Sequence, residues 1–245
     1  MPFNRLRQFV SGFLSTKETD PRKAYNLWAR GYDSQPGNLM LDLDEKLFSE
    51  LIDPLPIKGT TVADIGCGTG RHWTKLLAKQ PARIAGFDVS EEMLRKLNEK
   101  FPAAETHQLA PDNFVEMPNS SCNLVFSTLT IAHIRDTWSA LSEWERVLAE
   151  NGDLVITDYH PAVLEKGGQR TFRHNGQLVA VKNYIHPLES IRELARQLQL
   201  KEIRFIEKII DESLRGWYEQ QNALAVYDKY RGSPVIYGIH FKKER

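Results

Sequence analysis

Short apolar runs and helical patterns alternate along most of the chain. The apolar runs cover residues 60–65, 82–88, 124–126 and 154–157, and a weaker one lies near 104–109. Between them, apolar residues recur every three or four positions at 69–79, 90–101 and 136–150, as on the buried face of a helix. Strands and helices that alternate at this spacing predict a mostly parallel sheet with helices on both faces.

Two helices are predicted before the first of these strands. Asp20 followed by Pro21 is a helix start, because the aspartate caps free N–H groups and proline fits the first turn. That helix ends near Gly31, and a second amphipathic helix follows it. We therefore divide the chain into an N-terminal helical extension, residues 1–55, and a main domain, residues 56–245.

The last third departs from simple alternation. Asn175 and Gly176 separate the segments 170–172 and 178–181, and an Asn-Gly pair in this setting is a strong signal for a tight hairpin turn. The remaining predicted elements are a helix near 187–199 and strands at 202–210 and 235–241. Because no full crossover pattern joins the final two strands, we expect them to pair antiparallel.

The first residues form a separate amphipathic pattern. Hydrophobic residues recur at helical spacing from Phe3 to Leu14, with Arg5 and Arg7 between them and no acid before Glu18. A transit peptide or a membrane-surface helix has this pattern. A short helix that docks on its own domain, or on a second copy in a homodimer, has it as well.

Composition limits the class of protein. Lysine plus arginine and aspartate plus glutamate each number 32 in 245 residues, so the formal net charge is zero, which argues against nucleic acid as a partner. Cys67 and Cys122 form neither a disulfide framework nor a metal-ligand spacing, so we predict no metal site and a reducing, cytoplasmic location. No run approaches the roughly 18 apolar residues of a transmembrane segment.

A glycine-rich turn follows the strand at 60–65. Gly66, Gly68 and Gly70 stand at alternate positions between that strand and a helix, so the backbone can approach a ligand beside a positive helix N-terminus. The next strand ends on Asp88, about 20 residues further on, where an acid can accept hydrogen bonds from both ribose hydroxyls. This arrangement predicts a nucleoside-binding α/β domain.

The spacing of the glycines indicates which nucleoside-containing ligand the turn binds. A dinucleotide fingerprint needs a third glycine at the sixth position, and Arg71 stands there. Asp64, two residues before the first glycine, suits a ligand that carries an ammonium and a sulfonium rather than a pyrophosphate. The run from Asp64 to Gly70 resembles the first motif of the class I S-adenosylmethionine-dependent methyltransferases.

The resemblance extends beyond this turn, over about residues 20–160. The segment after Asp88 is similar to the family's second strand end and following helix, and Arg146 to Ile156 resembles its Arg-Val-Leu, glycine and strand segment. The pattern is closest to small-molecule methyltransferases of the ubiquinone- and menaquinone-biosynthesis-like group. It implies a Rossmann-like α/β fold, with a seven-stranded, mostly parallel sheet whose last strand is reversed.

The resemblance also implies S-adenosylmethionine as cofactor and a helical lid over it within residues 1–55. Asp112 and Asn113 lie where relatives place an acid against the adenine amino group. The predicted cofactor-binding residues are Tyr32, Asp64, Gly66, Cys67, Gly68, Asp88, Val89, Met93, Asp112, Asn113 and Ser127.

The expected reaction is methyl transfer to O, N or C of a small-molecule acceptor. His133, Tyr159 and His160 follow the fourth and fifth predicted strands at the ligand-binding edge, so we predict that they converge there, with either histidine as base or orienter. A hairpin and helix insertion near 160–200 is expected to form the acceptor side.

Two other function classes stay open at this point. One is a non-catalytic, cofactor-binding regulatory or scaffold protein, and the other is an RNA or protein methyltransferase. Against nucleic-acid chemistry, the chain lacks the Asp/Asn-Pro-Pro-Tyr/Phe segment and the Cys-Pro nucleophile pair of such enzymes. Arg170, Arg173 and Lys182 on the hairpin are interpreted as protective charges of an edge strand, or alternatively as contacts for an anionic substrate.

Overall fold

The computed structural model describes residues 18–34, 38–109 and 117–244. The predicted N-terminal amphipathic helix lies outside these residues, as do Asp112 and Asn113. Among the described residues, none of the helices combines the length and the apolar character that a membrane crossing requires.

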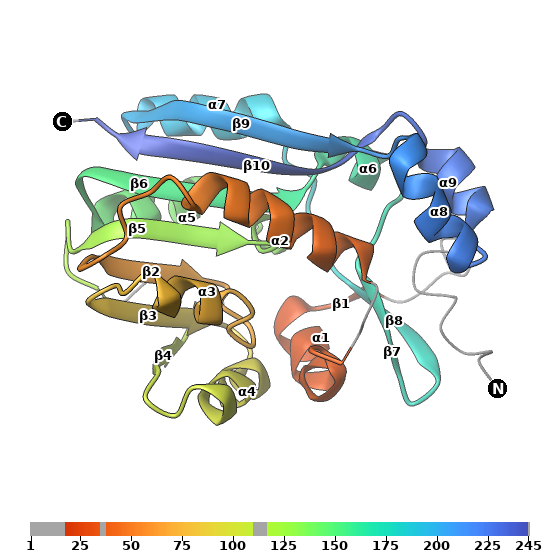
Figure 1. The fold of residues 1–245 in the computed structure, drawn as a ribbon, viewed down its shortest axis with the longest axis horizontal. Coiled ribbons are helices and arrows are strands. Elements are labelled where there is room, and N and C mark those ends of the chain that lie inside the picture. The colour runs from red at the N-terminus through yellow and green to blue at the C-terminus, as the bar shows by residue number, and fades with distance from the viewer. Residues whose placement is uncertain (1–17, 35–37, 110–116, 245) are drawn as a thin grey trace.

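A seven-stranded sheet forms the centre of the molecule, in the order β4-β3-β2-β5-β6-β10-β9. Strands β2 to β6 pair in parallel, whereas β10 runs antiparallel to both of its neighbours, so the predicted reversed last strand is confirmed. Figure 1 shows the β10 arrow pointing against the others. The strands are β2 (Thr61–Ile65), β3 (Arg83–Asp88), β4 (Glu105–Gln108), β5 (Cys122–Thr128), β6 (Leu148–Tyr159), β9 (Leu200–Ile209) and β10 (Pro234–Lys243).

Helices cover both faces of this sheet, as the alternating sequence predicts (Figure 1). Along β2, Val62 packs with one group of helices, while Ala63 and Ile65 pack with the other, because side chains on a strand alternate between its faces. The first face carries α2 (Leu39–Ile52), α3 (Trp73–Ala78) and α4 (Glu91–Lys100); the second carries α5 (Thr137–Val147) and α7 (Leu188–Gln197).

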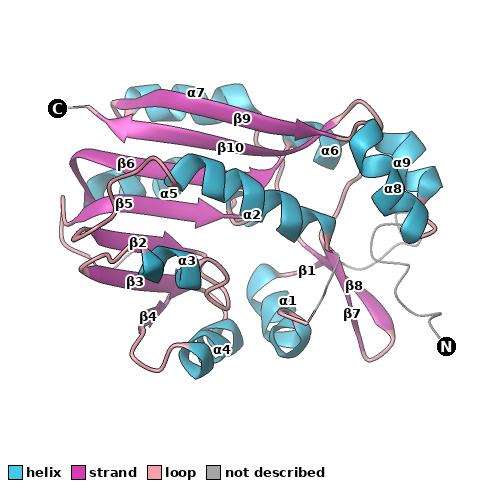
Figure 2. Cartoon of the chain, in the orientation of Figure 1, coloured by secondary structure: helices cyan, strands magenta, loops and turns pink. Residues whose placement is uncertain are grey.

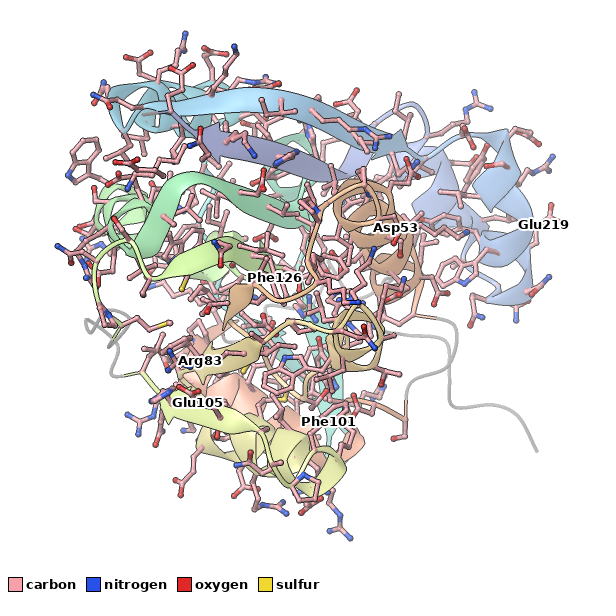
Figure 3. The ribbon with its side chains drawn as sticks, turned by 60° about the vertical axis from the view of Figure 1, so that its left-hand side comes forward. Asp53, Arg83, Phe101, Glu105, Phe126 and Glu219 are labelled. Carbon is pink, nitrogen blue, oxygen red and sulfur yellow. The ribbon has the colours of Figure 1, made fainter. Side chains whose placement is uncertain are left out.

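Aromatic packing holds α2 on the sheet, and an ion pair joins two strands at the sheet edge. Phe126 on β5 is fully buried, with its ring centroid 5.1 Å from that of Phe48 on α2 (Figure 3). At the β4 edge, Arg83 Nε donates to Glu105 Oε2 at 2.8 Å across neighbouring strands, and Figure 3 shows the two side chains together. The ligand-binding edge lies at the other end of these strands, where their carboxyl termini meet.

A second, three-stranded sheet lies beyond the carboxyl ends of the parallel strands (Figure 2). Its hairpin is the predicted one, because the turn residues Asn175 and Gly176 both have positive φ, at 49° and 78°. Helix α1 starts at the predicted Asp20 cap and packs against both hairpin strands and α4. The elements are β1 (Glu18–Thr19), α1 (Pro21–Trp28), β7 (Thr171–His174) and β8 (Gln177–Val181).

Two predictions about element boundaries are wrong. The helix expected at 136–150 ends at Val147, because the buried Leu148 already belongs to β6, and the left-handed Asn151 lies inside that strand. The final two strands are joined by two helices, α8 (Glu212–Gln220) and α9 (Leu224–Tyr230), which were not predicted. Gly216 in the middle of α8 lowers its helix propensity and obscured the pattern. Helix α6 (Pro161–Glu165) follows β6 directly.

Candidate functional site

The glycine turn after β2 is fastened to the end of β3 by backbone hydrogen bonds. The N–H groups of Gly66 and Cys67 both donate to Phe87 O, at 2.7 and 3.0 Å. Gly66 has φ of +74°, and a Cβ at this position would lie 2.1 Å from Thr130 Oγ1, so only glycine fits. The backbone of the turn therefore follows a path that requires glycine at position 66.

Asp88 is the acid around which this turn is organised. Its Oδ2 accepts from the N–H of Gly68 and its Oδ1 from the N–H of Ser90, both at 2.8 Å. The side chain is 8 % exposed, and burial raises its pKa to about 6 even though these N–H groups favour the charged form. Each carboxylate oxygen has two lone pairs, so Asp88 keeps the capacity to accept from hydroxyl groups.

Asp64 lies beneath the same turn. The indole of Trp73 donates to its Oδ2 at 2.8 Å, while Oδ1 is buried and has no partner among the described residues. Gly86 makes room for this arrangement, because a Cβ there would come within 2.9 Å of the Trp73 ring and 3.0 Å of Cys67 Sγ. Burial raises the pKa of Asp64 to about 8, so a positively charged ligand would stabilise its anion.

Helix α1 and the segment after it cover the glycine turn. Asp33 Oδ1 accepts from the hydroxyl of Thr69, and Asn26 Oδ1 accepts from the hydroxyl of Ser90, each at 2.7 Å. Met93 at the start of α4 is buried in the same cluster of side chains as α1. These contacts place α1 over the predicted cofactor residues.

His133 and Tyr25 form a hydrogen-bonded pair at the carboxyl end of β5. The Nε2 of His133 lies 2.8 Å from the Tyr25 hydroxyl, and its Nδ1 lies 2.9 Å from the carbonyl oxygen of Lys182. A carbonyl can only accept, so Nδ1 carries the proton and Nε2 of the neutral ring accepts from Tyr25. Burial, together with the charge of Arg170, lowers the pKa of His133 to about 4, which keeps the ring neutral.

Arg170 lies inside a cage of aromatic rings, so its interpretation as a protective edge charge is wrong. The side chain is 3 % exposed, and its Nη2 donates to the Tyr32 hydroxyl at 2.7 Å. Arg173 and Lys182, further along the hairpin, are exposed. Arg170 differs because it precedes β7 and is directed toward α1. The rings around its guanidinium, with centroids 5.3–5.9 Å from Cζ, are Tyr25, Trp28, Tyr32 and Tyr159.

Asp158 links the end of β6 to the turn that carries His133. Its carboxylate is fully buried and accepts from the N–H groups of Ala132, at 2.8 Å, and Tyr159, at 2.6 Å. Burial raises the pKa of Asp158 to about 7. His133 and Tyr159 are therefore both brought close to Arg170.

His160 is not part of this cluster, and the predicted convergence of three residues is wrong for it. Its Nδ1 accepts from the N–H of Ala162 at 3.1 Å and caps α6, while its Nε2 lies 3.5 Å from Glu207 Oε2 on β9. Its ring also meets that of Tyr237 on β10 edge to face. Consecutive residues at a strand end point to opposite sides, so Tyr159 and His160 cannot share one pocket.

Two further predicted cofactor residues, Ser127 and Val89, lie on or just after strands of the sheet. The Ser127 hydroxyl on β5 is buried without a partner among the described residues. Val89 is half-buried, and its carbonyl accepts from Gln108 Nε2 at 3.3 Å. Both lie at the carboxyl ends of their strands, next to the glycine turn.

Sequence reasoning missed Asp44, a fully buried acid on α2. It accepts hydrogen bonds from Arg71, from the hydroxyl of Thr157 and from His72 Nε2, the last at 3.1 Å. Burial alone would raise its pKa, but Arg71 and His72 hold the pKa well below its usual range. The signal in the sequence is that this acid stands among the apolar residues on one face of the second predicted helix. Asp44 fixes the start of α3 and so the exit of the glycine turn.

Comparison with known proteins agrees with this geometry. Residues 63–156 match the family described as a methyltransferase domain. Over this stretch the chain is similar to a methyltransferase domain of the class I, S-adenosylmethionine-dependent kind. A demethylmenaquinone methyltransferase of Listeria welshimeri is 29% identical over 151 residues, 58% of this chain and 64% of that protein. A 27-O-demethylrifamycin SV methyltransferase of Amycolatopsis mediterranei is 24% identical over 161 residues, 62% of this chain and 59% of that protein.

The structural superposition covers a larger share of its relative than the two sequence alignments cover of theirs. A solved S-adenosylmethionine-dependent methyltransferase from Listeria monocytogenes superposes with a TM-score of 0.63 at 21% identity. It covers 82% of this chain and 99% of that one, and so supports the fold. The sequence matches span less than two thirds of the two methyltransferases named above.

The cofactor of this methyltransferase class is S-adenosylmethionine, and the residues present fit it. The orphaned Oδ1 of Asp64 is a buried acceptor suited to a cationic ligand, and Asp88 has free acceptor capacity for hydroxyl groups. A Cβ at Gly68 would meet nothing within 4 Å, so the turn is open on that side. These three features lie within one strand–helix–strand unit, from β2 to the end of β3.

Proposed function

We propose that this methyltransferase moves a methyl group from S-adenosylmethionine to a small-molecule acceptor. The observation that carries the proposal is the double fastening of Asp88, to Gly68 in the glycine turn and to Ser90 at the start of α4. It fastens the acid proposed to bind the ribose to the loop that the cofactor tail would contact. The named relatives act on small molecules, a menaquinone precursor and a rifamycin, which supports a small acceptor here.

The proposed cofactor site uses the predicted residues in two groups. Asp88, with Val89 and Met93 beside it, would hold the ribose, and Asp64 would face the amino-acid tail. The remaining proposed contacts are Tyr32, Gly66, Cys67, Gly68 and Ser127, together with the predicted Asp112 and Asn113. The segment 1–55 keeps its proposed role as an extension and lid, and the hairpin and helix within 160–200 its role on the acceptor side.

The Tyr25–His133 pair provides a path for a proton. The cofactor supplies a methyl group that its sulfonium already activates, so the protein must mainly align the reactants and exclude water. If the acceptor atom carries a proton, that proton passes to the Tyr25 oxygen while the Tyr25 proton passes to His133 Nε2. His133 then acts as the base through Tyr25, and Tyr159 packs beside them against Arg170.

Calorimetry with S-adenosylhomocysteine tests the cofactor site. We expect one site per chain, no binding of NAD, and a loss of about 2–3 kcal/mol in Asp88→Ala, or roughly 30- to 150-fold, because a charged acceptor is removed. Asp228→Asn, an exposed acid on α9, is the matched control and should bind as wild type. Absence of heat with wild type, or equal affinities in Asp88→Ala and the control, would refute the proposal.

A further inference from the structure

Arg170 is a buried cation without an acidic partner. Among residues 18–34, 38–109 and 117–244, no carboxylate lies within ion-pair distance of it, and its side-chain hydrogen bonds go to tyrosine hydroxyls: Nη2 donates to Tyr32 at 2.7 Å, and the guanidinium also bonds Tyr159. Its Nε and Nη1 are buried without a hydrogen-bond partner in the same part of the chain. Burying an unpaired charge with unsatisfied donors is costly, so the site is incomplete without an anion.

The surrounding groups position the guanidinium but do not neutralise it. Cation–π contacts with four rings hold it in place. The nearest acid is Asp158, whose two oxygens already accept from the N–H groups of Ala132 and Tyr159. His133 is neutral, and burial raises the pKa values of Tyr25 and Tyr159, so these hydroxyls are neutral as well. The cage therefore presents a fixed positive charge with free donors.

The order of the strands assigns this charge to the acceptor side. Asp88 ends β3 and Tyr159 ends β6, and β2 and β5 lie between them. Strands are spaced by about 4.8 Å, so the two ends lie roughly 14 Å apart along the sheet edge. His133, the hydrogen-bond partner of Tyr25, follows β5, which is the strand next to β6.

We propose that Arg170 binds an anionic group of the methyl acceptor, so that the substrate is a small organic anion, a carboxylate or a phosphate ester. The inference rests on the proposed function and deepens it. The anion accepts hydrogen bonds from the unsatisfied donors of Arg170. These bonds orient the acceptor atom toward Tyr25. Because the cage is covered by α1 and the hairpin, these must part for the acceptor to enter.

The test follows the Arg170 side chain directly by NMR. Full-length protein carrying ¹⁵N-labelled arginine is titrated with sodium formate, then with inorganic phosphate, with and without S-adenosylhomocysteine and at constant ionic strength in chloride. The Arg170 Nε–H signal is assigned by its loss in Arg170→Lys. Formamide is the neutral probe matched to formate, and the exposed Arg173 of the same hairpin is the internal control.

We expect a saturable shift of the Arg170 signal with formate or phosphate, at millimolar concentration, and little change for Arg173 or with formamide. A formate shift identifies a carboxylate acceptor and a phosphate shift a phosphate ester. No saturable shift with either anion, or an equal shift with formamide, would overturn the inference.

A second measurement separates the acceptor from the cofactor carboxylate. Calorimetry compares S-adenosylhomocysteine with 5′-methylthioadenosine, which lacks the amino-acid tail, in wild type and Arg170→Lys. We expect both affinities to be unchanged by the substitution. A loss for S-adenosylhomocysteine alone would show that Arg170 binds the cofactor, and would overturn the inference. Failure of wild type to bind S-adenosylhomocysteine would instead refute the proposed function, whatever the anion titration shows.

Discussion

The two ends of the ligand-binding edge are built from different kinds of contact. At β2 and β3, the glycine turn is held by backbone N–H groups whose acceptors are about 20 residues away, as in the bond from Gly68 to Asp88. At β5 and β6, side chains from distant segments meet: Tyr25 and His133 are 108 residues apart, and Tyr32 and Arg170 are 138 apart. The glycine turn at the proposed cofactor end is thus held by local bonds and only covered by α1, whereas the pairs at the proposed acceptor end form only when α1 is docked.

The largest effect is expected from a substitution at the proposed acceptor end. His133→Asn should lower turnover by roughly 10²–10⁴-fold, because the base behind Tyr25 is removed, while cofactor affinity stays near wild type. Steady-state kinetics on an identified acceptor measures this. His160→Asn is the matched control and should keep activity near wild type, since its ring faces Glu207. Equal losses in the two variants would contradict the placement of the catalytic pair.

The same kinetics has an expected pH dependence. The folded pKa of His133 is about 4, so turnover should stay level across neutral pH and fall only as the pH drops toward about 4. Protonated Nε2 cannot accept the Tyr25 proton, which gives the direction of the change. A midpoint near the ordinary histidine pKa of about 6.5 would show that a different, solvated histidine is the base.

The next effect tests the cofactor end. Gly66→Ala should lower the free energy of unfolding by about 2–4 kcal/mol, because the added Cβ meets Thr130 and adopts positive φ. Gly68→Ala has open space at its Cβ, so only the backbone cost of about 1–2 kcal/mol remains. Urea unfolding measures both. The double variant Gly66→Ala, Thr130→Gly should recover part of the loss; no recovery would refute the steric cause.

A smaller effect is expected in the affinity for S-adenosylmethionine as pH changes. Asp88 and Asp64 have folded pKa values of about 6 and about 8, and a cationic ligand binds their anions better than their acids. Affinity should therefore rise with pH through both values, by at most tenfold per pH unit for each group. Asp64→Asn should remove the upper part of the rise. A flat profile in wild type would show that neither carboxyl faces the positive charge.

The smallest effect concerns the covering helix. Binding of S-adenosylhomocysteine should slow hydrogen exchange in residues 20–34, because α1 lies over the glycine turn through Asn26 and Asp33. Helices α8 and α9 serve as the reference and should not change. Equal exchange in α1 with and without ligand would show that this segment is no lid.

Sequence could predict the cofactor end because its signals are local. The glycines, Asp64 and Asp88 lie within about 25 consecutive residues, and strand periodicity sets their faces. The hairpin was predicted from Asn175 and Gly176 for the same reason.

The acceptor end was predicted less well because its contacts depend on tertiary structure. Nothing near Arg170 in sequence shows that four aromatic rings enclose it, so its charge suggested an exposed edge. His160 was placed beside Tyr159 because one strand end does not reveal which way each side chain points. Tyr25 was not assigned a role, since its partner His133 comes from a different part of the chain.

The backbone of Lys182 joins the hairpin both to the segment before α1 and to His133. Its N–H donates to Thr19 O just before α1, at 2.9 Å, and its carbonyl accepts from His133 Nδ1. In the proposed mechanism, a hairpin displaced from His133 would remove the bond that selects the imidazole tautomer, and a displaced α1 would remove Tyr25. Such an open form would hold the cofactor without a working base, and closure over an acceptor would restore the base. On this proposal, methyl transfer to water or to another nucleophile would be slow until the acceptor is enclosed.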